Sequence, residues 1–310
     1  MTLKERAVLT PIVFFDLFDR PVRPAGLKHL VYGQSMTESE FESILTELER
    51  RREIIRRRGF LSLPDRPGLT ENGIRRDQIS TELAKEAATV IGRLASVPFV
   101  KMIAIINSLA FWNANQDSDI DILVVTEPGR IAIARDHINL LLTFWGRRNT
   151  RGVKRGKIAP DVFLDTDRLA LEDFHMSPHD IYFDFWCARI TPIINRDGTY
   201  ERLLAANPWI RKVFPVFQPR TEFIVPPRPD REVRRKGWEW FYQHTPIGRW
   251  WGAVMTNRAG ARLRRYQARS GERDLVVVSP HVLRFHVPDK RPEYQAQFEA
   301  RWHALSGSHS

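Results

Sequence analysis

Apolar side chains recur at helical spacing in three segments near the start of the chain. Two of these segments cover residues 9–18 and 25–31, and Pro24 stands where proline favours the first turn of a helix. The third begins after Thr37, because Glu40 follows it at the spacing of a capping box. The apolar face of this third helix consists of Phe41, Ile44, Leu45 and Leu48.

Residues 53–58 and 59–63 then predict two short strands around a tight turn, so the segment resembles a winged helix. The third helix carries acids that repel phosphate, namely Glu38, Glu40, Glu42, Glu47 and Glu49. The end of this helix and the wing carry a basic patch, namely Arg50, Arg51, Arg52, Arg56, Arg57 and Arg58. A structural or protein-contacting role is therefore favoured over DNA contact through the wing.

The middle of the chain alternates between helical and extended patterns. Helices are expected over residues 77–95 and 130–145. Apolar runs predict strands over residues 99–106, 119–126 and 158–164. This order of elements favours an α/β domain with a mixed sheet flanked by helices, in a chain whose overall class is expected to be α+β.

Beyond residue 200 the chain becomes helical, aromatic and basic. Its tryptophans include Trp209, Trp238, Trp240, Trp250 and Trp251. A basic, Trp-rich helix can lie on an anionic membrane, but tryptophans more often anchor packing. We therefore do not expect a membrane surface as a partner. Residues 274–278 and 282–285 predict two further strands.

These patterns divide the chain into three parts. They are a winged-helix-like domain over residues 1–75, a core over residues 76–200, and a basic, mostly helical C-terminal region over residues 201–310. Hydrophobic residues make up 43% and charged residues 27% of the 310 positions, which is typical of a folded protein.

The single cysteine, Cys187, excludes an intramolecular disulfide and fits a reducing compartment. The chain shows no signal peptide and no uncharged apolar stretch near the ~18 residues of a membrane span. We therefore expect a cytoplasmic protein. The net charge of +11 is compatible with anionic partners such as nucleic acid, nucleotides or anionic lipid. Arginine-rich proteomes also contain many basic proteins without such partners, so the charge alone does not decide between the two interpretations.

Asp119 and Asp121 are the most informative candidates for chemistry. Alternation along a strand places both side chains on one face, with Cα atoms ~6.6–7 Å apart. Their neighbours Ile120, Ile122 and Leu123 are apolar, so the strand is expected to be buried. Because paired buried carboxylates need compensation, we expect a hard cation such as Mg²⁺.

The surrounding residues resemble the signature of the DNA polymerase beta-type nucleotidyltransferase superfamily. In that signature a hydrophobic strand ends in a Gly-Ser turn, and Asp-hydrophobic-Asp follows roughly ten residues later. Here Ile106 leads into Asn107-Ser108, and ten residues separate Ser108 from Asp119-Ile120-Asp121. The order of winged helix, core and basic tail also resembles a group of bacterial nucleotidyltransferase-domain proteins.

This resemblance implies a nucleotidyltransferase fold and a two-metal transfer of NMP from an NTP to an acceptor hydroxyl, with release of pyrophosphate. Asp119 and Asp121 would bind two Mg²⁺ ions, and Asn107 and Ser108 would lie against the nucleotide phosphates. A third carboxylate from a neighbouring strand would complete the catalytic and metal site. The acceptor could be a small molecule, an RNA end or a protein side chain.

Asp161 is the best candidate for the third carboxylate, because it opens the apolar strand about forty residues downstream. Neighbouring strands lie ~4.8 Å apart, close enough for a shared metal site. Asp165 lies ~13 Å further along the strand and is the weaker candidate. Asp117 is interpreted as a loop residue, and the nine histidines show no convincing ligand pattern.

The chain departs from the superfamily signature at two positions. Asn107 stands where the signature has glycine, and Trp112 stands where many small members have a second glycine. Asparagine tolerates a left-handed backbone, so the turn can survive. Its side chain could crowd the nucleotide, and the indole could narrow the triphosphate pocket or stack on a base.

Three functions follow from these patterns. The first is an active Mg²⁺-dependent nucleotidyltransferase. The second is a nucleotide-binding or regulatory protein of the same fold that has lost turnover, because of Asn107 and Trp112. The third is a basic nucleic-acid-binding protein in which the winged helix and tail dominate.

Overall fold

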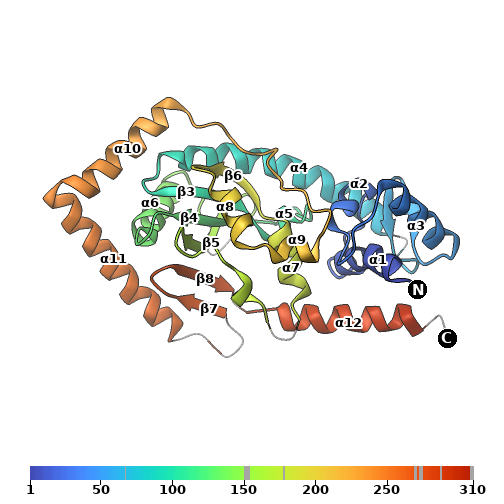
Figure 1. The fold of residues 1–310 in the computed structure, drawn as a ribbon. Helices are drawn as coiled ribbons and strands as arrows, with labels where there is room; N and C mark the ends of the chain where they lie inside the picture. Colours follow the sequence, from blue (N-terminus) through green and yellow to red (C-terminus); the bar gives the residue numbers. More distant parts are fainter. Residues whose placement is uncertain are drawn as a thin grey trace.

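The computed structural model describes residues 1–66, 68–149, 154–176, 179–268, 271, 275–286 and 288–307. Its centre is a six-stranded mixed sheet with strand order β6-β3-β4-β5-β8-β7 (Figure 1). Its strands are β3 (Val100–Ile105), β4 (Ile120–Thr126), β5 (Ile158–Asp165), β6 (Thr191–Asn195), β7 (Leu275–Val278) and β8 (Val282–His286). β4 and β5 run parallel, whereas the other neighbouring pairs are antiparallel. The expected α+β class with a mixed sheet is thus confirmed.

The N-terminal unit has the expected three helices and hairpin. Its elements are α1 (Leu3–Asp16), α2 (Pro24–Leu27), the 3₁₀ turn η1 (Lys28–Leu30), α3 (Glu38–Arg50), β1 (Ile55–Arg57) and β2 (Phe60–Ser62). The capping box of Thr37 and Glu40 is confirmed at the start of α3. α1 begins before the expected position, because Thr2 and Glu5 form a second capping box.

A long helix connects this unit to the sheet. α4 (Leu69–Arg93) starts before the expected residue 77 and runs without a break through the boundary expected between residues 75 and 76. Asp77 on this helix accepts hydrogen bonds from Arg20 and Arg23 of the N-terminal unit. A 3₁₀ turn, η2 (Leu94–Ser96), follows α4 and leads into β3.

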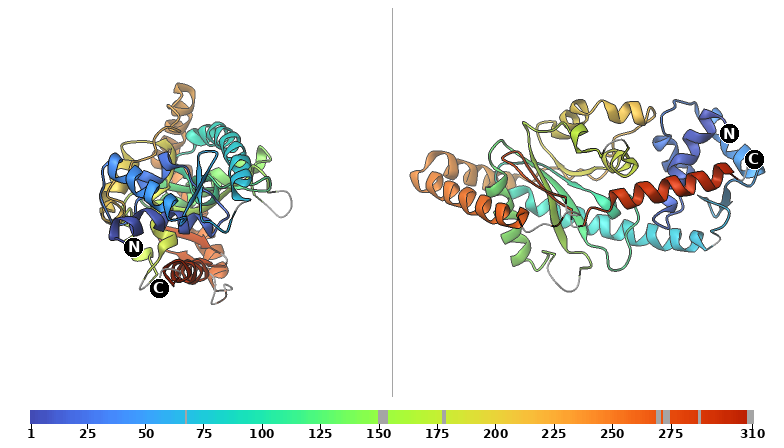
Figure 2. Two further views of the ribbon diagram at one scale, coloured as in Figure 1. Left: turned by 90° about the vertical axis from the view of Figure 1, so that its right-hand side faces the viewer. Right: turned by 90° about the horizontal axis from the view of Figure 1, so that it is seen from below.

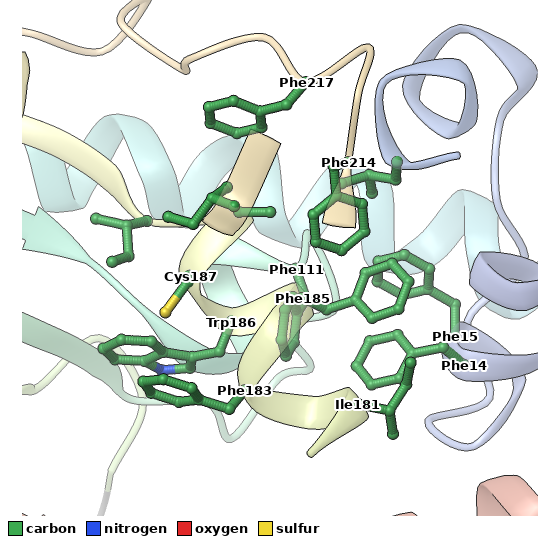
Figure 3. Packing of buried hydrophobic residues seen from close by; sticks show 14 of the residues in the cluster. Phe14, Phe15, Phe111, Ile181, Phe183, Phe185, Trp186, Cys187, Phe214 and Phe217 are labelled. Carbon is green, nitrogen blue, oxygen red and sulfur yellow. The ribbon is translucent and has the colours of Figure 1, made fainter. Parts of the chain in front are cut away.

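The two faces of the sheet pack against different helices. α4 and α6 (Ile131–Phe144) cover one face. The other face contacts α7 (Ile181–Ala188), α8 (Thr199–Ala206), α9 (Trp209–Val213) and the N-terminal unit. On this face Phe185 of α7 stacks on Phe14 of α1, with ring centroids 4.1 Å apart, and Cys187 is fully buried (Figure 3).

The C-terminal region adds both strands and helices. α10 (Pro229–His244) and α11 (Pro246–Gln267) form a hairpin, and α12 (Arg291–Gly307) packs against α7 and α1. The two further strands are confirmed as β7 and β8, and β8 joins the central sheet beside β5. Asp274, the expected first residue of β7, lies outside the described residues.

None of the helices in the described part of the chain is long and apolar enough to cross a membrane.

Candidate metal and nucleotide site

The predicted site residues lie at one edge of the sheet, where β3 ends and β4 and β5 begin. Asp119 directly precedes β4, and Asp121 is its second residue. Asp121 alternates with Leu123 and Val125, which pack in the cluster shared with α7. The Asp121 side chain is therefore on the sheet face that α7 covers.

A β-bulge brings Asp161 toward Asp121. Ile122 pairs with Pro160 and the next residue, Leu123, pairs with Val162, so Asp161 is an extra residue in β5. Such a bulge interrupts the alternation of side chains and can redirect one of them. The carboxyl groups of Asp121 and Asp161 are hydrogen-bonded to each other, and Asp119 is close enough to act on both.

Burial and neighbouring negative charge disfavour the ionised forms of Asp121 and Asp161. Burial and the charge of Asp119 raise the pKa of Asp121, against opposing hydrogen bonds from Asn107 and Asp161. Burial and the charge of Asp121 raise the pKa of Asp161 as well. A hydrogen bond between two carboxyl groups needs one of them to be protonated. The buried carboxyl groups of Asp121 and Asp161, with Asp119 beside them, are oxygen donors that fit a hard divalent cation, which would take the place of that proton.

Asn107 has the backbone conformation that usually favours glycine. It begins the short helix α5 (Asn107–Ala110), which is separated from β3 by one residue, and its φ is 55°. Its side chain is held at both ends. The Nδ2 group donates to Asp121 Oδ2 at 3.0 Å, and Oδ1 accepts a hydrogen bond from the Trp186 indole N–H at 2.8 Å. Ser108 follows in α5 and is half-buried. The turn is thus compatible with asparagine, whose amide occupies one oxygen of Asp121.

Trp112 also has a left-handed backbone, with φ of 59°. Its indole packs against Phe223, with centroids 5.6 Å apart, and beneath the guanidinium of Arg220. It lines a cavity of about 360 Å³ whose walls include Arg20 and Asp77 but none of the three aspartates. The described contacts of the indole are therefore with Phe223 and Arg220, not with the residues expected to hold the triphosphate.

We expect Asn107→Ala to destabilise the protein by about 1 kcal/mol more than Asn107→Gly, because an L side chain without polar compensation is strained at φ of 55°. Both variants lose the same two hydrogen bonds, so each is the control for the other. Urea unfolding measures the difference. Equal stability of the two variants would contradict the left-handed conformation.

Three residues at the site were not predicted from the sequence. Asn149 donates from Nδ2 to Asp119 Oδ2 at 2.5 Å, Trp186 holds Asn107, and the charge of Lys154 acts on Asp121. Asn149 and Lys154 lie in the connection before β5, and Trp186 lies on α7. No local pattern marks them, because only the tertiary fold brings them to the aspartates.

A second group of possible ligands lies at the other end of β5. Among the described residues, Asp165, Asp167 and His281 have ligand atoms that all lie within 4.8 Å of one another, a mutual spacing that Asp119, Asp121 and Asp161 do not reach. Asp165 is fully buried and accepts from the Gly129 N–H at 3.3 Å, while His281 Nδ1 lies 2.9 Å from its Oδ2. These partners explain the buried carboxylate without a metal, and the sequence did not single out this group.

Comparisons with family models, curated proteins and solved structures found no match to this chain. The resemblance to the nucleotidyltransferase superfamily therefore depends on the residues and geometry described above.

Proposed function

We propose that the chain is a Mg²⁺-dependent nucleotidyltransferase with an N-terminal winged helix, which moves NMP from an NTP to an acceptor hydroxyl. The observation that carries this proposal is the bulge at Asp161, which brings a third carboxyl group toward Asp121. These three residues would hold two Mg²⁺ ions. When bound, the ions would stabilise the attacking and leaving oxygens of an in-line displacement.

The turn after β3 supports the same function. Asn107 stands where the superfamily has glycine, and Trp112 stands where many small members have another glycine. Both residues have positive φ angles. Glycine takes this conformation at no steric cost, so the two φ angles fit the glycine positions of the superfamily's phosphate-binding turn. Ser108 is part of this turn, and we assign its hydroxyl to the nucleotide phosphates.

Nucleotide binding without turnover is the second candidate, and the side chain of Asn107 favours it. Its amide donates to Asp121 Oδ2, an oxygen that a metal ion would need. A bound Mg²⁺ must displace this hydrogen bond or bind through the other oxygen. The Trp186 N–H holds the opposite end of the amide, which makes displacement more costly.

Nucleic-acid binding through the wing receives less support. Several arginines of the basic patch are paired with acids of α3 or α4. Arg50 pairs with Glu47, Arg56 with Glu49, and Arg58 with Glu71. Neutralised arginines attract phosphate less than free ones.

The deciding experiment incubates the full chain with each labelled NTP and Mg²⁺, alone and with lysate fractions as a source of acceptor. The transferase predicts Mg²⁺-dependent incorporation of label. The binding protein predicts a rise in melting temperature with NTP and Mg²⁺ but no product with any fraction. Absence of both product and a melting shift would refute both candidates.

A further inference from the structure

The hairpin of α10 and α11 exposes the tryptophans that were expected to anchor packing. The hairpin projects at the end of the molecule opposite the N-terminal unit (Figure 1; Figure 2). Trp209 is buried, as a packing anchor should be. By contrast, the exposed fractions around the turn of the hairpin are 59% for Trp240, 70% for Ile247, 62% for Trp250 and 43% for Trp251. We call these four residues the hairpin tip.

The hairpin tip continues along one face of α11. Positions 247, 250, 251 and 254 recur at helical spacing, and Arg258 and Arg265 extend the same row toward the C-terminal end of the helix. The opposite face is the packed one. Gly248 and Gly252 are buried there, and a side chain on Gly252 would meet Ile133 of α6 and Tyr242 of α10. The outward face is therefore apolar near the turn and basic further along.

All the charged residues of α11 are basic. The sequence of this helix contains no aspartate or glutamate and five arginines, namely Arg249, Arg258, Arg262, Arg264 and Arg265. Arg249, Arg258, Arg264 and Arg265 are exposed and form no ion pair with any other described residue. In α10, by contrast, Arg234 and Arg235 are paired with acids of the same helix.

We propose that the hairpin tip binds an anionic phospholipid surface. Exposed tryptophans and isoleucine at a projecting turn would enter the boundary between headgroups and acyl chains, where indole rings are favoured. The unpaired arginines behind them would lie at the level of the anionic headgroups. No helix needs to span the bilayer for this mode of binding.

The chemistry of the tip favours a lipid surface over other occupants. A second copy of the chain that docked through the same face of its own α11 would place Arg258 and Arg265 against arginines, because the helix carries no acid. A nucleic acid would satisfy the arginines but would leave Ile247, Trp250 and Trp251 without an apolar environment. An anionic bilayer satisfies both kinds of side chain. The proposal is independent of the nucleotidyltransferase assignment.

Co-sedimentation of the full chain with vesicles tests the proposal. We expect binding to vesicles of phosphatidylglycerol and phosphatidylcholine, and much weaker binding to phosphatidylcholine alone. Trp240→Ala combined with Trp250→Ala should weaken binding by about tenfold or more, since affinity scales with inserted apolar area. Arg258→Glu combined with Arg265→Glu should weaken it by at least about tenfold and reduce its dependence on salt.

Matched controls lie at the other end of the molecule. Leu3→Ala truncates a side chain that is 73% exposed on α1, and Arg52→Glu combined with Arg57→Glu reverses two exposed charges near the wing. Both control variants should bind as the unchanged protein does. Circular dichroism confirms that every variant is folded.

Several results would overturn the proposal. One is failure of the folded protein to bind anionic vesicles at low salt, and another is equal loss of binding in the tip and control variants. Light scattering that shows a dimer, converted to monomer by Trp240→Ala and Trp250→Ala without any vesicle binding, would assign the tip to a second copy. Binding of RNA or DNA that is lost in the tip variants, with no vesicle binding, would assign it to nucleic acid.

Discussion

Replacing Asp121 with asparagine is expected to abolish nucleotidyl transfer while leaving the protein folded. Asparagine keeps the size of the side chain and can still accept the hydrogen bond from Asn107. It removes a negative charge that would bind the proposed metal ions. The loss of several kcal/mol of transition-state stabilisation would lower the rate of transfer by roughly a thousandfold or more. Asp119→Asn should have the same effect. Incorporation of label from NTP measures both.

Asp117→Asn is the matched control for these variants. Asp117 is exposed in the loop two residues before Asp119, and only its backbone N–H is bonded to the Asn115 side chain among the described contacts. Asp117→Asn removes one negative charge, as Asp121→Asn and Asp119→Asn do. Any effect of net charge on transfer should therefore be equal in the three variants. Transfer should stay close to that of the unchanged protein. Activity retained in Asp121→Asn, or lost equally in Asp117→Asn, would contradict the assignment.

Replacing Asp161 with asparagine is expected to remove transfer and, in the metal-free protein, to increase stability. Burial and Asp121 raise the pKa of Asp161 above its usual value, so the folded state holds a proton that the unfolded state releases as the pH rises. Stability is therefore lost between about pH 4 and the raised pKa of the folded state. Asparagine carries no charge and avoids this loss.

Urea unfolding in EDTA at pH 5 and pH 8 measures this effect. We expect Asp161→Asn to be more stable than the unchanged protein by on the order of 1 kcal/mol or more at pH 8, and by less at pH 5. Asp117→Asn should show no such gain at either pH. A loss of stability in Asp161→Asn at pH 8 would show that the carboxylate is compensated by other groups of the protein.

Elements with local signals could be predicted from the sequence. The capping box of Thr37 and Glu40 starts α3 at the expected residue, and the apolar runs around Asp119 and Asp161 correspond to β4 and β5. These signals depend on a few neighbouring residues. The left-handed turn at Asn107 was anticipated only as a tolerance of asparagine, and the structure shows that the turn uses it.

Features that depend on distant partners could not be predicted. The bulge at Asp161 arises from the register between β4 and β5, and β6 and α7 were not identified as elements. Asn149 and Trp186 reach the site only through the fold. The exposure of Trp250 also escaped prediction, because composition does not reveal which face of a helix is covered. Sequence patterns thus located the aspartates but not the groups that hold them.

The most direct test of the central claim is to locate Mn²⁺ by anomalous diffraction in crystals grown with a non-hydrolysable NTP. If the chain is a nucleotidyltransferase, Mn²⁺ should bind between Asp119, Asp121 and Asp161, with the phosphates near Ser108. Asp165, Asp167 and His281 form an internal comparison in the same crystal. Manganese at this second group with none at the three aspartates, at saturating Mn²⁺ and NTP, would contradict the claim.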